Sequence, residues 1–391
     1  MSSIYRRPFL AQQMARSLLR PGVLDEGLRS GLFLSGLRRT GKTTFLRHDL
    51  IPALEDLGAV VIYVDLWTDT EANPATLVHE ALRQALRELQ NPASRVLGRL
   101  RNVTGGDIDA LGFRFGFKVE QVGARGGVTL ARALAEVVDQ ARTDVVLVVD
   151  EVQQAITSED GNRMLLALKA ARDAINPRPD TPGHFLFVGT GSHRALVNEL
   201  TARRNQAFAG ATSVAYPVLG PDYVAHLLER LRAEGATNLP GLDAATKAFV
   251  TLGHRPEELL RALRDLRQHL SDPDAADTVL PVLAASLRSR AADVEFLKLE
   301  RLGTLAEAIF DRIAQSPGPA RGLFSADAVA DYGRRIGRPV RVEEIQPILN
   351  EMLAANVVMR LAHGQYGVTD PFVQDVWRER KARDDDSPAV P

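Results

Sequence analysis

Two glycines, a lysine and a threonine in one short stretch have the spacing of a phosphate-binding loop. Gly36 and Gly41 enclose four residues, and Lys42 and Thr43 follow directly, so the stretch fits the pattern G-x-x-x-x-G-K-[ST]. Glycines let the backbone curl until consecutive N–H groups point inward, and the lysine can reach the β and γ phosphates. The residues that we expect around the phosphates are Gly36, Leu37, Arg38, Arg39, Thr40, Gly41, Lys42, Thr43 and Thr44.

Two adjacent acidic residues have the types needed to hold a metal ion and to activate water. Asp150 and Glu151 follow the apolar run 145–149, which predicts a buried strand. The Thr43 hydroxyl and the Asp150 carboxylate suit Mg²⁺, so these are the predicted metal ligands. The Glu151 carboxylate could orient and polarise an attacking water. Lys42 and Glu151 are therefore the predicted catalytic residues of a nucleoside triphosphate site.

Further polar residues could sense the γ phosphate. The apolar run 184–188 predicts another buried strand, and Thr190, Ser192 and Arg194 lie at its end. Either hydroxyl could hold the water or the γ phosphate, and Arg194 could sense the same group, although each also fits a polar turn. Arg255 joins two predicted helices. It is either an exposed turn residue or a side chain that swings onto the phosphates when a lid closes.

The elements that must position these groups alternate between strands and helices. Apolar runs predict strands over 31–35, 59–64, 145–149, 184–188 and 213–216. Helical patterns separate them, which is typical of a parallel sheet with helices on both faces. We therefore predict an α/β core over 1–216 and, from the helical pattern that follows, a lid over 217–300.

The stretch 91–127 interrupts this alternation and is predicted to be an insertion in the core. Apolar and polar residues alternate over 111–119, which predicts a strand with one apolar face. Arg114, Lys118 and Arg125 nearby could bind a partner or nucleic acid. We favour the alternative that the phenylalanines of the insertion fold onto the domain, because buried aromatic residues usually belong to a core.

The last part of the chain predicts a winged helix. Three helical patterns and a hairpin occupy 301–383, and an acidic tail over 384–391 is expected to be disordered. The third helix, usually the DNA reader, carries acids, whereas an arginine cluster before it could contact phosphates without reading bases. We favour a structural or protein-contacting role over DNA binding. The acids are Glu343, Glu344 and Glu351, and the arginines are Arg334, Arg335, Arg338 and Arg341.

The composition is that of an ordinary globular protein. The 391 residues are 45% hydrophobic and 25% charged, with a formal net charge of -1, so bulk charge gives no reason to expect nucleic acid or an anionic membrane. The absence of cysteine excludes disulfides and thiolate metal sites. No apolar run approaches the roughly 20 residues of a bilayer span, so we expect a cytoplasmic protein without membrane contact.

Several of these stretches together resemble a known family. They are SGLRRTGKTT, VVDEVQQ, VGTGS and GHRP, together with the terminal winged helix. In combination they resemble the archaeal-type ATPases of the AAA+ superfamily, which are related to the signal-transducing ATPases with numerous domains. The resemblance implies an α/β P-loop NTPase fold with a parallel sheet of strand order 5-1-4-3-2, a helical lid and a C-terminal winged helix. It also implies binding of ATP with Mg²⁺.

Two positions depart from the pattern of this family. Its members commonly begin with a Phe-x-Gly-Arg-Glu segment that contacts the nucleotide, where this chain has Pro8 and Phe9. These two residues are candidate base contacts, although we favour a helix that covers the sheet edge. Members also often carry arginine before the last core strand, whereas alanine follows Gly210 here. Arg203 and Arg204 are the nearest residues that could act on a neighbour's ATP.

The hypothesis that follows is an ATP-hydrolysing molecular switch, which couples nucleotide state to movement of the lid and the winged helix and acts on an unidentified protein partner. A binding module that holds ATP without significant turnover is a second hypothesis. A DNA-associated ATPase of a mobile element or defence system is a third. A small-molecule kinase is disfavoured, because nothing in the sequence marks an acceptor site.

Overall fold

The computed structural model describes residues 4–69, 72–104, 112–124, 126–156, 158–192, 197, 200–201, 206–269, 275–362 and 364–386. Contacts between residues divide the chain into two units. The first unit contains residues 1–36 and 42–217, and the second contains residues 37–41 and 218–391.

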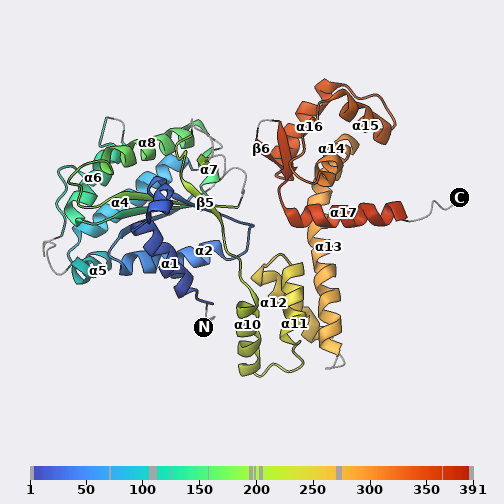
Figure 1. Cartoon of the computed structure of the whole chain (residues 1–391), viewed down its shortest axis with the longest axis horizontal. Coiled ribbons are helices and arrows are strands. Elements are labelled where there is room, and N and C mark those ends of the chain that lie inside the picture. The colour runs from blue at the N-terminus through green and yellow to red at the C-terminus, as the bar shows by residue number, and fades with distance from the viewer. Residues whose placement is uncertain are drawn as a thin grey trace. The chain divides into compact units, whose positions relative to one another are not determined.

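A parallel sheet of five strands forms the centre of the first unit (Figure 1). Its strands are β1 (Leu32–Ser35), β2 (Val60–Asp65), β3 (Val145–Asp150), β4 (Phe185–Gly191) and β5 (Thr212–Ala215). All four neighbouring pairs are parallel, and the order is β2-β3-β4-β1-β5. This order confirms the expected 5-1-4-3-2 arrangement. The carboxyl ends of the strands therefore meet at one edge, where ligands bind in open α/β sheets.

Helices cover both faces of this sheet, with α6 and α8 on one side and α1 on the other (Figure 1). The helices of the first unit are α1 (Pro8–Leu19), η1 (Val23–Ser30), α2 (Lys42–Phe45), η2 (Leu46–Leu50), α3 (Ile51–Asp56), α4 (Pro74–Gln90), α5 (Arg95–Thr104), η3 (Val119–Gln121), α6 (Leu130–Ala141), α7 (Gln153–Ile156) and α8 (Glu159–Ile175). Helices α4, α6 and α8 each carry an apolar stripe that packs in the core on one face of the sheet.

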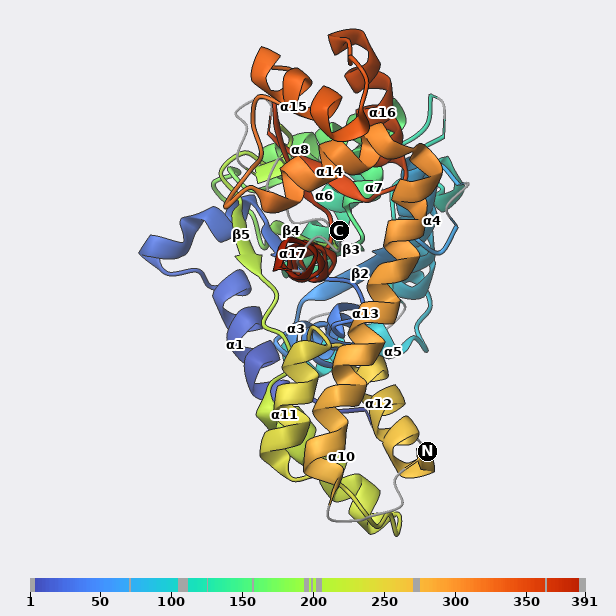
Figure 2. The same ribbon diagram turned by 90° about the vertical axis from the view of Figure 1, so that its right-hand side faces the viewer.

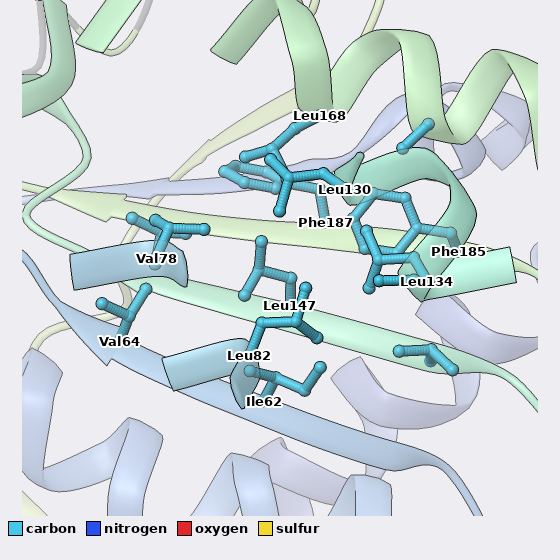
Figure 3. Packing of buried hydrophobic residues seen from close by; sticks show 14 of the residues in the cluster. Ile62, Val64, Val78, Leu82, Leu130, Leu134, Leu147, Leu168, Phe185 and Phe187 are labelled. Carbon is cyan, nitrogen blue, oxygen red and sulfur yellow. The ribbon is translucent and has the colours of Figure 1, made fainter. Parts of the chain in front are cut away.

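Alternate side chains of the strands fill two separate apolar cores. On one face, Leu147 and Phe187 of the sheet pack with Leu82, Leu134 and Leu168 of α4, α6 and α8 (Figure 3). The other face packs against α1 and against the helical stretch that begins with α2. Because both faces are buried, the strands are continuous apolar runs in the sequence.

The expected strand over 111–119 is wrong for the described residues 112–118, which form neither a strand nor a helix. The backbone N–H groups of Arg114 and Gly116 donate to the side chains of Gln140 and Glu136 on α6 instead of to a neighbouring strand. The phenylalanines nevertheless pack on the core. Phe113 is buried, and Phe115 and Phe117 are partly buried. The favoured alternative for these aromatic residues is therefore confirmed. Arg125 lies outside the described residues.

One long helix, α13, runs through the second unit (Figure 2). It packs against α11 and α12 in one part and against α14, α16 and α17 in another. The helices are α10 (Pro221–Ala233), α11 (Leu242–Thr251), α12 (Pro256–His269), α13 (Ala276–Leu302), α14 (Thr304–Gln315), α15 (Ala326–Ile336), α16 (Val342–Ala354) and α17 (Pro371–Asp386). Helices α11 and α12 and helices α14, α16 and α17 thus pack on the same long helix.

The C-terminal part of the second unit has the elements of a winged helix. Three helices, α14, α15 and α16, precede the antiparallel hairpin of β6 (Val358–Ala362) and β7 (Gln365–Val368). Their apolar side chains form one core that includes Phe310, Tyr332 and Leu349. Helix α17 continues to Asp386, so the expected disorder is wrong for 384–386, while 387–391 lie outside the described residues.

Candidate nucleotide-binding site

The phosphate loop lies between β1 and α2, at the carboxyl edge of the sheet. Gly41 has a φ of 91° and Arg39 a φ of 63°, so the chain turns twice through left-handed backbone before the helix begins. Gly36 has a different role. A Cβ atom added there would lie 3.1 Å from Cβ of Tyr216, so the loop passes close to the strand-end residue beside it. The two glycines therefore satisfy different local requirements.

The Lys42 side chain folds back over its own loop. It is only 6% exposed, and its Nζ donates a hydrogen bond of 2.7 Å to the carbonyl oxygen of Gly36. The Thr40 hydroxyl donates to the carbonyl oxygen of Leu37 at 2.8 Å, which closes the middle of the loop. The ammonium group is thus held at the loop, where a bound phosphate would meet it.

Asp150 joins the loop to the neighbouring strands. Its carboxylate is 1% exposed, and Oδ2 accepts hydrogen bonds from Thr43 Oγ1 at 2.6 Å and from the Tyr63 hydroxyl at 3.3 Å. Oδ1 accepts a hydrogen bond from Thr190 Oγ1. The structure therefore brings the predicted metal ligands Thr43 and Asp150 together, with the sensor candidate Thr190 directly beside them.

These groups fit a magnesium ion. A hydroxyl and a carboxylate are hard oxygen ligands, and Mg²⁺ usually takes one or two carboxylates and completes its shell with water and substrate phosphates. Across the described ranges, no group of three or more histidine, cysteine or acidic residues forms a ready-made metal cage. The donor set thus suits a metal ion that arrives with a nucleotide.

The sequence interpretation missed three residues near Asp150, namely Tyr63, Arg47 and Asp65. Arg47 lies 4.8 Å above the Tyr63 ring and 3.8 Å from Asp65. Burial and then the charge of Asp150 raise the pKa of Tyr63, so its hydroxyl stays protonated and donates. Burial also raises the pKa of Asp65, which is paired in register with Asp150. The sequence did contain a signal for these residues. Side chains alternate between the two faces of a strand, so a strand that ends at Asp65 has Tyr63 and Asp65 on one face.

Glu151 follows Asp150 in a left-handed backbone conformation with a φ of 56°. Its Oε2 accepts a hydrogen bond of 3.0 Å from the Ser192 hydroxyl and another from the Gln153 amide. The predicted catalytic residue Glu151 and the sensor candidate Ser192 are therefore in direct contact. Gln153 was not predicted as a site residue.

The N-terminal segment also reaches this edge. Arg7 donates to the Tyr216 hydroxyl at 3.2 Å and to the carbonyl oxygen of Pro217, and its guanidinium lies 5.7 Å from the Phe45 ring centre. Phe9, a candidate base contact, is 81% exposed on α1, and Pro8 starts that helix. The residue that lies against the loop's neighbour Tyr216 is thus Arg7, just before the expected positions.

Other predicted residues lie elsewhere. Arg255 belongs to the second unit, where it donates to Asp370 and lies 4.9 Å from the Phe372 ring centre. Arg194, Arg203 and Arg204 lie outside the described residues.

Comparisons with known proteins concern the domain and the fold. Residues 26–197 match the family model of the AAA domain. A Walker-type ATPase of Pyrococcus abyssi is similar over 96% of this chain and 99% of that chain, with a TM-score of 0.55 and 16% identity. The ADP form of the ORC2 protein of Aeropyrum pernix is similar over 98% of this chain and 96% of that chain, with a TM-score of 0.54 and 13% identity. A search of curated proteins gave no match.

The AAA domain match and the site geometry concern the same part of the chain. Residues 26–197 contain the phosphate loop, the Asp150–Glu151 pair and the β4 end that contacts both acids. Within the described part of the chain, no helix is long and apolar enough to cross a membrane. Residues 26–197 therefore match the AAA domain, and the strand order together with the two solved structures shows the fold that the chain shares with them.

Proposed function

We propose that the protein is a molecular switch, in which binding and hydrolysis of ATP at the phosphate loop change the positions of the lid and the winged helix. The observation that carries the catalytic part is the 2.6 Å hydrogen bond between Thr43 and Asp150. It places a hydroxyl and a carboxylate at one point, beside the loop that carries Lys42. This is the arrangement that a metal-bound triphosphate requires.

Each residue of the site has a distinct task in this proposal. Backbone N–H groups of 37–43 and the Lys42 ammonium bind the phosphates and neutralise their charge. Thr43 and Asp150 would hold Mg²⁺, which supplies charge stabilisation at the β and γ phosphates when bound. Glu151 accepts the proton of the water that attacks in line. Thr190 fixes the orientation of Asp150.

The switch part depends on contacts inside the second unit. Arg255, between α11 and α12, donates to Asp370 and stacks near Phe372 at the start of α17. For Arg255 to sense a γ phosphate, its guanidinium must leave both partners. We propose that this exchange links the state of the nucleotide to the winged helix.

The hydrolysis arm of the test compares three proteins. Phosphate release is measured for the wild type, Lys42→Ala and Glu151→Gln, together with ATP affinity. We expect Lys42→Ala to lose affinity, and Glu151→Gln to keep it while turnover falls about 100-fold or more. Wild-type rates in both variants would exclude this site as the catalytic centre. Tight ATP binding by the wild type without turnover would favour the binding-module hypothesis.

The movement arm uses the absence of cysteine in the chain. Gln90→Cys on α4 and Glu351→Cys on α16, both exposed, provide two labelling sites for a donor and an acceptor dye. We expect the transfer efficiency to differ between ATP-bound Glu151→Gln and the ADP-bound wild type. An equal efficiency in both states would reject the switch but not the hydrolysis.

The described surface of the winged helix favours a protein partner over DNA. The arginines that could have contacted a phosphate backbone are paired with acids of the same domain. The ion pairs are Arg334–Asp331, Arg335–Asp311, Arg338–Glu344 and Arg341–Glu344. Their charge is therefore largely neutralised locally. Fluorescence anisotropy measures binding of duplex DNA to the wild type and to the double variant Arg334→Ala with Arg335→Ala. We expect no salt-dependent binding that is present in the wild type and lost in the double variant.

A further inference from the structure

The Glu151 carboxylate is held from one side only. Its Oε2 accepts hydrogen bonds from Ser192 Oγ and Gln153 Nε2, and Gln153 Nε2 also donates to Ser192 Oγ at 3.1 Å. The three side chains thus form a closed ring of hydrogen bonds. Among the described residues, Oε1 of Glu151 has no hydrogen-bond partner, and Glu151 is only half-buried. One oxygen therefore accepts two hydrogen bonds, and the other accepts none from the described residues.

Burial of the Gln153 amide beside Glu151 is energetically unfavourable in one respect. Gln153 is 1% exposed, and its Oε1 is buried without a hydrogen-bond partner in the described structure. An unpaired buried carbonyl is unfavourable, so a long apolar side chain would satisfy the packing better. The amide N–H that contacts Glu151 is the feature that an apolar side chain lacks. This favours a role for the N–H beyond filling space.

The backbone is adapted to this side chain. A Cβ atom at Gly191 would lie 2.5 Å from Gln153 Oε1 and equally close to a methyl carbon of Val197, so a side chain there would displace one or both of them. Glu151 itself has a left-handed backbone conformation, which is unfavourable for a residue other than glycine. Such local costs concentrate where a side chain must be aimed in one direction.

Residues at the end of β4 donate hydrogen bonds to both Asp150 and Glu151. Thr190 donates to Asp150 Oδ1, and Ser192, two residues later, donates to Glu151 Oε2. The N–H of Val152 donates to the carbonyl oxygen of Thr190 at 2.8 Å, which ties the turn after β3 to the same strand end. The hydrogen bonds from β4 to Asp150 and to Glu151 therefore both come from one short segment.

We propose that Gln153, together with Ser192, is a positioning residue for ATP hydrolysis. Its amide holds Oε2 of Glu151 so that Oε1 faces the attacking water. This inference rests on the proposed role of Glu151 as the base. Gln153 does not touch the nucleotide in this proposal. It acts through Glu151, so its loss should lower kcat and leave ATP affinity unchanged, because misplacing a reactive group by about 1 Å can cost 100-fold.

The experiment compares Gln153→Met, which keeps the volume but lacks the N–H, with Gln153→Glu, which replaces the donor by a second carboxylate. Steady-state phosphate release gives kcat and KM, nucleotide titration gives ATP affinity, and a thermal melt checks the fold. We expect kcat to fall about 10- to 100-fold in Gln153→Met and further in Gln153→Glu, with KM within about twofold of the wild type. Gln90→Met, on the exposed side of α4, is the control for a glutamine substitution.

A double-mutant cycle separates positioning from a purely structural role. In the Glu151→Gln background, Gln153→Met should cause no further loss of kcat, because the base that it positions is already absent. An equal additional loss in that background, or a kcat for Gln153→Met within about twofold of the wild type, would overturn the proposal. If Gln153→Met does not fold, Ser192→Ala and Ser192→Thr replace it, and only the threonine should retain activity.

The failure of the proposed function has a different signature. If Glu151→Gln hydrolyses ATP as fast as the wild type, Glu151 is not the base, and the positioning role is rejected with it. If Glu151→Gln is inactive while all Gln153 and Ser192 variants are fully active, only the positioning role is rejected.

Discussion

Thr43 Oγ1 donates a hydrogen bond of 2.6 Å to Asp150 Oδ2, although 107 positions of the chain separate the two residues. The contact exists because β1 and β3 both flank β4, so the loop after β1 and the turn after β3 emerge at the same edge. A metal ion that uses both oxygens has to enter at this contact. The hydrogen bond therefore joins the end of the candidate phosphate loop to the end of β3.

The hydroxyl at position 43 should control the magnesium requirement. We expect Thr43→Ala to raise the Mg²⁺ concentration for half-maximal phosphate release about tenfold or more, because one oxygen ligand is lost. Thr43→Ser keeps the hydroxyl and serves as the matched control, with a requirement close to that of the wild type. A titration of Mg²⁺ at saturating ATP makes the measurement. Equal requirements in Thr43→Ala and the wild type would remove Thr43 from the metal site.

Gly41 should tolerate no side chain. Its φ of 91° is left-handed, and an L-residue there costs about 1–2 kcal/mol unless the loop changes shape. We expect Gly41→Ala to weaken ATP affinity about tenfold, measured by isothermal titration or a fluorescent nucleotide. Gly318→Ala is the control, because a Cβ atom at Gly318 would meet no atom within 4 Å. An unchanged affinity in Gly41→Ala would mean that the loop does not bind phosphate in this conformation.

Asp311 should be a major stabilising residue of the winged helix. It is buried on α14, and its carboxylate accepts hydrogen bonds from Trp377 Nε1 at 2.7 Å and from Arg335. Asp311→Ala leaves both donors without this acceptor, so we expect a loss of about 2–4 kcal/mol in the free energy of unfolding.

Urea denaturation followed by tryptophan fluorescence measures this loss. The Asp327 side chain contacts Arg312 but is 87% exposed. Asp327→Ala should therefore change the free energy of unfolding by less than about 0.5 kcal/mol. Equal effects of the two substitutions would contradict the assignment.

Tyr332 should make stability fall at high pH. Burial raises the pKa of Tyr332 to about 12 from an ordinary value of 10.0, and its hydroxyl is buried without a hydrogen-bond partner in the described structure. The hydroxyl is neutral in both states below about pH 10. Between pH 10 and 12 it ionises in the unfolded chain but not in the folded one, so this contribution to stability is lost as pH rises.

Tyr332→Phe tests this linkage. At pH 8 we expect the variant to be as stable as the wild type or slightly more stable, because no hydrogen bond is lost. At pH 11 the difference in the free energy of unfolding should move in favour of the phenylalanine by about 1–2 kcal/mol. Denaturant unfolding at both pH values makes the measurement, and a difference that does not depend on pH would reject the linkage.

Local sequence was enough for the elements whose residues interact with near neighbours. The phosphate loop is defined by glycine conformations and a lysine within one turn, so its motif identifies it. The strands were readable as apolar runs, since a parallel sheet covered on both faces buries most of its side chains. The order of the strands came from the family resemblance, because no periodicity encodes which strand lies beside which.

Alternation was not enough for residues 112–118, where the same period of two did not produce a strand. A strand requires a partner for its backbone hydrogen bonds, and here the side chains of Gln140 and Glu136 took that part. Periodicity describes which side chains are apolar. It does not state where backbone N–H groups find their acceptors.

The sequence by itself identified the residues of the candidate site, namely a phosphate-loop motif, a hydroxyl and two acids, because these follow from residue types at short spacing. Tertiary structure alone decided which side chains surround them. Tyr63 reaches Asp150 across 87 positions, Ser192 reaches Gln153 across 39, and Arg7 reaches Tyr216 across 209. Such contacts arise only when packing of both sheet faces brings distant strand ends to one edge.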